Sequence, residues 1–323
     1  MRTILGIDGS IQLGLEEIQE IKRYALHDTA YFYREEVAAI NSYILFYQAN
    51  QKEKAQDDLN QFNLAHENSP LIAFLKASMA LRSGQNEDCI RYIKQSPIKN
   101  GQATFYYLDF MLGRSLLYKL DPNADTHILK YLSHFKGQHF IKEAYQKLAW
   151  HALAVKGDAD LYEYYMQQCL SKGQTLLDED KQALREAKSG STPNPIILKA
   201  RLLYDGGYYH QAYQHLILHQ EVFTSNRNAL FELEYNYRLG RTLQQLKNYQ
   251  DAVHYLAKVI DLGQKETTYF ACASALQIGH IYEQQGEFAK SKMYYRSCLT
   301  MSPDEYKTTL HQKAKSGLLR LGE

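Results

Sequence analysis

The chain has 323 residues, and its 37 lysines and arginines nearly balance 36 aspartates and glutamates, which gives a formal net charge of +1. A dedicated nucleic-acid-binding protein usually carries a basic excess or a basic patch, so this balance argues against nucleic acid as a partner. Hydrophobic residues make up 45% of the chain, which is typical of a globular protein and not of a disordered one.

The apolar runs in the sequence are short. A clean example, residues 71–75, is far below the roughly 20 apolar residues that a membrane-spanning helix needs. The first residues also lack the long apolar stretch of a signal peptide. We therefore expect no membrane span and a cytoplasmic location. The abrupt start also fits a piece of a longer protein, and the location of such a parent chain stays open.

Helical spacing of apolar residues begins near the N-terminus and recurs along the chain. One stripe is formed by Tyr33, Val37, Ile40, Ile44 and Tyr47, at steps of four and three residues. The same segment has a second apolar face, which predicts a helix packed between neighbours. No stretch alternates over strand lengths, and only six prolines interrupt the chain. The pattern predicts an all-α protein.

The sequence divides into a less regular and a more regular part. Weak helix-pair patterns cover residues 31–65, 71–96, 106–131 and 139–170, and an extra helix is predicted at 175–188. The segment 189–195, rich in serine and proline, is the clearest joint. We therefore expect an irregular helical array over residues 1–188 and a regular array with a C-terminal capping helix over residues 193–323.

The regular part repeats itself. Small residues recur at Ala200, Gly240 and Gly279, and a second set recurs at Ala212, Ala252 and Ser291. In both sets the spacings are 40 and 39 residues, so two independent series of small residues repeat with the same period. Such self-similarity is the signature of stacked repeat units.

These segments resemble the tetratricopeptide repeat, a helix–turn–helix unit of about 34 residues. If Leu233 is position 1, then Gly240 and Ala252 take the family's small positions 8 and 20; counted from Cys272, Gly279 and Ser291 do the same. The units are longer than usual, and position 4 lacks the usual large apolar residue. The resemblance implies an α-α superhelix, a solenoid of about seven helix pairs. We expect the small residues at 8 and 20 to approach closely, while aromatic residues at 17 and 24 fill the gap to the next pair.

A second, looser resemblance concerns residues 6–15 followed by residues 69–76. Together they look like the tetratricopeptide-repeat-39 and inclusion-body-clearance proteins, and this resemblance would cover most of the chain. It implies a non-enzymatic, soluble repeat protein and little more.

Motifs that carry chemistry are missing from the sequence. The phosphate-binding loop, the dinucleotide fingerprint, HExxH and GxSxG do not occur. The four cysteines form no CxxC pair, and we expect buried free thiols. His215 and His219 are spaced to bind a metal on a helix, but without an evident third ligand we interpret them as a surface or groove pair. We expect no enzyme, no cofactor and no metal.

The resemblance implies a binding groove on the concave side, lined by first-helix positions 2, 5, 9, 12 and 13. The candidate groove residues are Arg114, Arg201, Tyr204, Tyr237, Arg241, Gln244, Gln245, His280, Glu283 and Gln284. Arginine at position 9 of several units predicts a partly basic, aromatic-lined groove for a segment with acidic residues. In the alternative interpretation these arginines pair locally with Glu234 or Glu283. Family members that bind the C-terminal peptides of chaperones carry lysine and asparagine at positions 5 and 9. This chain lacks them at those positions, which disfavours a chaperone peptide as the ligand.

The function predicted from these patterns is a non-enzymatic scaffold that binds a peptide or partner protein in its concave groove. The alternative is a superhelical module that senses a small ligand or signalling peptide, with residues 189–195 as a hinge. An enzyme with an unrecognised site is the third hypothesis. The sequence leaves the identity of the partner and the oligomeric state open.

Overall fold

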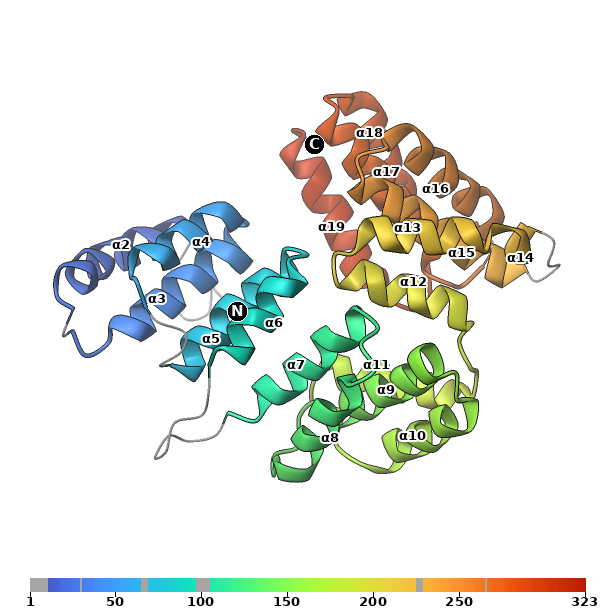
Figure 1. Cartoon of the computed structure of the whole chain (residues 1–323). Helices are drawn as coiled ribbons and strands as arrows, with labels where there is room; N and C mark the ends of the chain where they lie inside the picture. Colours follow the sequence, from blue (N-terminus) through green and yellow to red (C-terminus); the bar gives the residue numbers. More distant parts are fainter. Residues whose placement is uncertain (1–10, 30, 65–68, 97–104, 225–228, 265) are drawn as a thin grey trace. The chain divides into compact units, whose positions relative to one another are not determined.

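The structure is a computed structural model that describes residues 11–29, 31–64, 69–96, 105–224, 229–264 and 266–323. All regular secondary structure in these ranges is helical, as predicted (Figure 1). The chain folds into two compact units, one formed by residues up to 116 together with 123–137, the other by 117–122 and 138–323. This division by contacts falls elsewhere than the joint predicted at 189–195, which was drawn from repeat regularity and stays a prediction.

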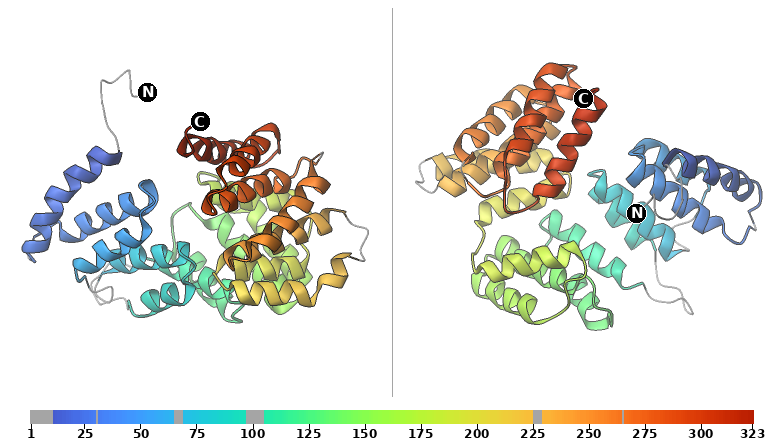
Figure 2. Two further views of the ribbon diagram at one scale, coloured as in Figure 1. Left: turned by 90° about the horizontal axis from the view of Figure 1, so that it is seen from above. Right: turned by 180° about the vertical axis from the view of Figure 1, so that it is seen from behind.

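Seven helix pairs, close to the predicted number, can be recognised in the described residues (Figures 1 and 2). The first unit begins with α2 (Ile11–His27) and continues with α3 (Arg34–Tyr43), η1 (Ile44–Gln48), α4 (Lys52–Gln61), α5 (Pro70–Arg82), α6 (Asn86–Lys94), α7 (Tyr107–Tyr118) and α8 (Ala124–His134). Its pairs are α3 with α4, α5 with α6, and α7 with α8. The short π-helix η1 continues α3 without a break.

The second unit holds the other four pairs and three further helices. Its elements are α9 (Ile141–His151), η2 (Ala152–Lys156), α10 (Ala159–Ser171), α11 (Asp178–Ser189), α12 (Pro195–Asp205), α13 (Tyr209–Leu218), α14 (Gln220–Thr224), α15 (Ala229–Gln245), α16 (Tyr249–Gly263), α17 (Phe270–Gln284), α18 (Phe288–Thr300) and α19 (Lys307–Arg320). The pairs are α9–η2 with α10, α12 with α13, α15 with α16, and α17 with α18. The extra helix predicted at 175–188 is α11.

The pairs of the second unit stack in two layers. The first helices contact one another in the order η2, α12, α15, α17 and α19, and form one row. The second helices α13, α16 and α18 each contact the first helix of the next pair, and lie along the other side of that row. A helix pair in such an array cannot bury both of its faces alone, so each pair depends on its neighbours.

Local sequence signals start several helices. The hydroxyl of Ser69 accepts a hydrogen bond from the amide of Ile72 at the start of α5, where Pro70 is the first helical residue. The side chain of Asn194 accepts from the amides of Ile196 and Ile197 at the start of α12. These side chains satisfy amide groups that have no partner within the helix.

The six repeated small residues are all buried, as the repeat pattern predicts. The predicted close approach of positions 8 and 20 is confirmed in the last pair, where the Ser291 hydroxyl donates to the carbonyl of Gly279 at 2.8 Å. Position 8 also receives a large side chain. A Cβ atom at Gly240 would lie 2.7 Å from Leu256 Cγ, and one at Gly279 would lie 2.5 Å from Tyr295 Cε1, so the side chain at position 24 of the same pair packs on the glycine.

Position 17 has its expected role in one pair, where Tyr249 packs partly buried against the core of the array, but not in the last pair. Phe288 occupies this position in the last pair and is 54% exposed, so it fills no gap between pairs. The ring of Tyr295, in contrast, is completely buried, and it lies against Gly279 of α17 on one side and Gly317 of α19 on the other. One aromatic side chain thus joins three helices at the C-terminal end of the array.

All four cysteines are buried and free, as expected from the sequence. Cys272 and Cys298 face each other across α17 and α18, with their sulfur atoms 3.5 Å apart. None of the helices in the described residues is long and apolar enough to cross a membrane.

Candidate functional site: the inner surface of the second unit

The row of first helices carries a cluster of cationic and aromatic side chains. We call this cluster the inner surface and define it as Trp150, Arg201, Tyr204, Glu234, Tyr237, Arg238, Arg241 and Tyr269. Trp150 comes from α9, the next two residues from α12, the following four from α15, and Tyr269 directly precedes α17. Five of these residues were predicted from the repeat positions: Arg201, Tyr204, Glu234, Tyr237 and Arg241.

Arg241 lies at the centre of the inner surface. Its guanidinium donates a hydrogen bond of 2.8 Å to the hydroxyl of Tyr204, and its Cζ lies 4.4 Å from the ring centre of Tyr204 and 5.7 Å from that of Tyr237. Burial, the largest effect, and the nearby charge of Arg238 lower the pKa of Arg241, but Tyr237, Tyr204 and Asp205 together outweigh them and raise it. The group therefore stays charged. Burial raises the pKa of Tyr204, although Arg241 opposes this shift.

No carboxylate in the described part of the chain lies within 4.0 Å of the Arg241 guanidinium. Its Nε atom is buried and has no hydrogen-bond partner there, and the same holds for Oε1 of Gln244, one helical turn further along α15. Arg241 is thus a partly buried cation that contacts tyrosines, and the Asp205 carboxylate acts on it only from beyond 4.0 Å. Burial of a charge without a counter-ion in contact is costly, so this arrangement favours an anionic ligand.

Arg238, which the repeat positions did not predict, has a different environment. It is 8% exposed, and its Nε and guanidinium NH2 group donate to Oε1 of Glu234 at 3.1 and 2.7 Å. Local pairing with Glu234, the alternative interpretation of the groove arginines, is therefore present here but concerns Arg238 rather than Arg241. Glu283 likewise pairs with Arg320 of α19, at 2.9 and 2.8 Å.

Aromatic rings surround the arginines of α15. Tyr237 is 3% exposed, and its ring packs against Tyr269 and Phe270, with ring centres 5.9 and 5.1 Å away. Burial raises the pKa of Tyr269 to about 12, so its hydroxyl is protonated at neutral pH and available as a donor. The rings also limit the access of water to the two guanidinium groups, which strengthens any charge interaction there.

Trp150 and Arg201 extend the cluster toward α9. The Arg201 guanidinium lies 4.4 Å from the centre of the Trp150 ring, and Lys147 Nζ lies 3.7 Å from that ring. The indole Nε1 donates to Glu186 of α11 at 2.7 Å. Arg201 is also 3.8 Å from Asp205 and is partly exposed. Trp150 is the one tryptophan of the chain, and this was the signal in the sequence that could have drawn attention to it.

The remaining predicted groove residues lie elsewhere. His280 contacts the ring of Tyr295, and burial lowers its pKa. Glu283 accepts from Tyr295 and Arg320, so its carboxylate joins α17 to α18 and α19. Gln245 and Gln284 are exposed at helix ends. Arg114 belongs to the first compact unit, where its guanidinium lies 5.6 Å from the ring of Phe110.

His215 and His219 do not form a metal site with other described residues. His215 Nε2 contacts the carbonyl of Ile196, and His219 Nδ1 contacts the carbonyl of His215. Within the described ranges, no three histidine, cysteine, aspartate or glutamate side chains are placed to hold a metal ion. Both histidines are half-buried, and their interpretation as a surface or groove pair stays a prediction.

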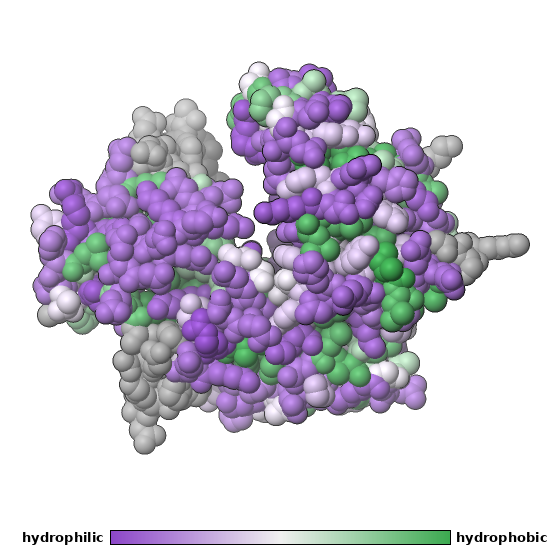
Figure 3. Space-filling view, turned by 45° about the horizontal axis from the view of Figure 1, so that its top comes forward, coloured by the Kyte–Doolittle hydropathy of each residue, from purple (hydrophilic) through white to green (hydrophobic). Residues whose placement is uncertain are grey.

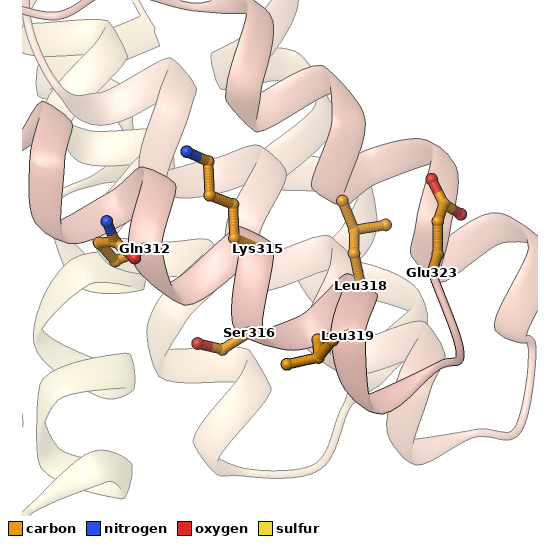
Figure 4. Close-up of a pocket in the computed structure, with 6 residues that line it drawn as sticks. All are labelled: Gln312, Lys315, Ser316, Leu318, Leu319 and Glu323. Atoms are coloured by element: carbon orange, nitrogen blue, oxygen red, sulfur yellow. The ribbon is translucent and has the colours of Figure 1, made fainter. Parts of the chain in front are cut away.

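Two hollows lie away from the inner surface. The larger, about 390 Å³, is on the outer side of α19 and is lined by Gln312, Lys315, Ser316, Leu318, Leu319 and Glu323 (Figure 4). The smaller, about 180 Å³, lies among α4, α5 and α6 of the first unit. The face drawn in Figure 3 is mostly hydrophilic, and its hydrophobic side chains form separate patches. Each hollow is lined by one lysine and one acidic residue, Lys315 with Glu323 and Lys76 with Asp88, and neither has an arginine or tryptophan in its lining.

A comparison with models of protein families matches the helices that carry much of the inner surface. Residues 232–304 match the family model of the tetratricopeptide repeat. The matched segment holds α15 to α18, which contribute half of the inner surface, and it is the region where the sequence resemblance is strongest. This region is therefore a tetratricopeptide-repeat region, and repeats of this kind use extended concave surfaces to bind proteins and peptides.

No curated protein matches the chain. Among the solved structures that match is the crystal structure of the apo form of RapI, with 13% identity, a TM-score of 0.35, and coverage of 94% of this chain and 86% of that chain. At this level the likeness carries no argument about function. None of these findings supports the finer resemblance to the tetratricopeptide-repeat-39 proteins. Of its residues, 6–10 lie outside the described part of the chain, and the resemblance stays a prediction.

Proposed function

We propose that the chain is a non-enzymatic interaction scaffold whose inner surface binds an acidic segment of a peptide or partner protein. The observation that carries this proposal is the environment of Arg241, a charged guanidinium without a carboxylate partner between two tyrosine rings. An acidic side chain would supply the missing counter-ion and could accept a hydrogen bond from Nε, a geometry that arginine favours with carboxylates. The rings of Tyr204 and Tyr237 would pack against the adjacent part of the ligand.

The other groups of the inner surface fit this ligand. Three arginines, Arg201, Arg238 and Arg241, outnumber the two carboxylates of Glu234 and Asp205 that lie within 4.0 Å of them. The surface thus keeps an excess positive charge although the whole chain is nearly neutral. Such complementarity favours rapid association with an acidic ligand and makes binding sensitive to salt.

Fluorescence anisotropy with a fluorescein-labelled peptide of alternating glutamate and alanine tests the proposal. A matched peptide with glutamine in place of glutamate should bind at least tenfold more weakly. Arg241→Gln should weaken binding of the acidic peptide about tenfold or more, because a hydrogen bond to a charged group contributes about 1.5–3 kcal/mol. Arg241→Lys keeps the charge but loses the planar group, so its effect should be intermediate.

Gln245→Ala is the matched control, since Gln245 lies on the same helix and is exposed at its end. It should leave the affinity unchanged, and the thermal stability of each variant should be checked by circular dichroism. Equal binding of both peptides, or full affinity in Arg241→Gln, would contradict the proposal. The module that senses a small ligand and the enzyme with an unrecognised site stay predictions that no described feature tests.

A further inference from the structure

Helix α11 is not part of a pair, and polar groups hold it on α9. The Asp180 carboxylate accepts from the amides of Phe140 and Glu143, at 2.8 and 3.1 Å, at the start of α9. The Glu186 carboxylate accepts from Trp150 Nε1 at 2.7 Å and from Gln146 Nε2 at 2.6 Å. These contacts fix the orientation of α11 along the helix that carries Trp150.

Apolar burial contributes little to this attachment. Besides Asp180, the buried residues of α11 are two alanines, Ala183 and Ala187, and Leu184 is half-buried, whereas neighbouring helices bury leucine, tyrosine or tryptophan. A hydrogen bond to a carboxylate contributes about 1.5–3 kcal/mol, whereas an alanine methyl buries little area, so the attachment of α11 is mainly polar. A helix held in this way can detach at a lower free energy than the core of the unit.

The other side of α11 reaches the distant end of the array. Arg185 Nε lies 3.5 Å from Glu305 Oε1, just before α19, and both side chains are about half exposed. The segment around Glu305 is itself joined to the start of α17: the amide of Asp304 donates to the carbonyl of Thr267, and the rings of Tyr306 and Tyr269 are 5.1 Å apart.

This contact spans the inner surface. In the row of first helices, α12 and α15 lie between α9, on which α11 rests, and the start of α17. The outer helices α13 and α16 cover the opposite side of the row, so a bridge from α9 to residue 305 passes on the side of the inner surface. Trp150 and Arg201 lie under one end of this bridge, and Tyr269 lies under the other.

We propose that α11 is a clasp over the inner surface, closed by the Arg185–Glu305 pair, and that its release admits the ligand. The part that concerns the ligand rests on the proposed function. Two backbone features suit release: Gly190 at the end of α11 has φ +64°, and Tyr306 at the start of α19 has φ +58°, a strained value for a tyrosine. An exposed ion pair contributes 0–1 kcal/mol, so closing and opening are finely balanced.

Trp150 is a built-in reporter of this clasp, because it is the one tryptophan, is 2% exposed and donates to α11. In Arg185→Ala we expect the acrylamide quenching constant of Trp150 to rise at least twofold, with a red shift of its emission. The charge-reversed double variant R185E/E305R should restore the wild-type value. Arg296→Ala is the matched control, because Arg296 forms an exposed pair with Glu323 away from α11 and should leave quenching unchanged.

The labelled acidic peptide completes the test. If the clasp controls access, the association rate in Arg185→Ala should rise at least threefold and return to normal in the double variant. Unchanged quenching in Arg185→Ala would overturn the clasp itself, whatever the peptide does. Increased quenching with an unchanged association rate would overturn its control of access. If no variant binds the peptide while quenching responds as expected, the proposed function fails and the clasp stands.

Discussion

At the scale of single residues, the C-terminal repeats depend on glycines that receive large side chains. Gly240 lies under Leu256, and Gly279 and Gly317 lie against opposite edges of the Tyr295 ring. An added methyl group at Gly279 would approach Tyr295 Cε1 and Cδ1 to 2.5 and 2.6 Å, closer than carbon atoms pack. Because Tyr295 is completely buried and a glycine lies against each edge of its ring, the ring has little room to move.

We therefore expect Gly279→Ala to lower the free energy of unfolding by about 1–3 kcal/mol, the usual cost of overpacking a core. Urea denaturation followed by circular dichroism measures this change. Gly14→Ala is the control: nothing lies within 4 Å of an added Cβ there, and alanine should raise stability by up to about 1 kcal/mol in the helix. In a Tyr295→Leu background the cost of Gly279→Ala should shrink; an undiminished cost would show that the ring is not its cause.

At the scale of helices, a buried polar group joins the first three helices of the first unit. Lys22 Nζ of α2 lies 2.7 Å from Asp58 Oδ2 of α4, and Asn41 of α3 donates to the same oxygen at 3.1 Å. Both members of the ion pair are nearly inaccessible to solvent. Such a pair adds little net stability, but it fixes which faces of the helices meet, because any other arrangement leaves a charge unpaired.

Asp58→Ala should therefore destabilise the first unit by about 3–5 kcal/mol, since Lys22 would remain buried without a partner. The double variant K22M/D58L should recover most of this loss, because two apolar side chains replace the pair. Asp88→Ala, which removes the exposed Asp88–Arg91 pair of α6, is the control and should cost less than about 1 kcal/mol. Thermal unfolding of the four proteins compares these values, and equal losses at Asp58 and Asp88 would refute the role of burial.

At the scale of the whole molecule, the second unit contains ionisable groups that resist protonation in the folded state. Burial lowers the pKa of His215 and of His280 from the ordinary value of 6.5. Glu283 raises the pKa of His280, while Arg320 and Lys313 of α19 lower it; His219 and Lys199 act on His215 in the same direction as burial. The hydrogen bond from Arg320 lowers the pKa of Glu283 below 4.5, against the effect of burial.

Both kinds of shift predict that acid weakens this unit. For the histidines, the unfolded chain binds protons first, so stability is complete above pH 6.5 and is lost as the pH falls toward the folded-state pKa. Glu283 contributes stability above pH 4.5, which is lost as the pH falls through its lowered pKa.

We expect the urea midpoint, measured by Trp150 fluorescence, to be lower at pH 5.5 than at pH 7.5. The difference between the two midpoints should be smaller in His280→Asn. His210→Asn, at an exposed position of α13, should keep the full pH dependence; if it and His280→Asn behave alike, His280 is not a cause.

The sequence alone determined the all-helical fold, about seven pairs, the extra helix α11 and the burial of the repeated small residues. These features follow from local spacing, since a small residue every 39 or 40 positions marks where helices pack closely. It also selected Arg241 and Tyr204, which lie on neighbouring first helices. The repeat positions of these two residues predict that both lie on the concave side of their helices.

Only the tertiary structure decided which charges are already satisfied. Glu234 is one turn from Arg238, and from the sequence it could pair with either arginine of α15. Glu283 was also a predicted partner of the groove arginines, but in the structure it pairs with Arg320, 37 residues away. The contact of α11 with Glu305 joins residues 120 positions apart and has no local signal. The Glu234–Arg238 pair has the i, i+4 spacing of a helix, but the choice between the two arginines depends on rotamers, and the partners of Glu283 and Glu305 come from helices that meet only after folding.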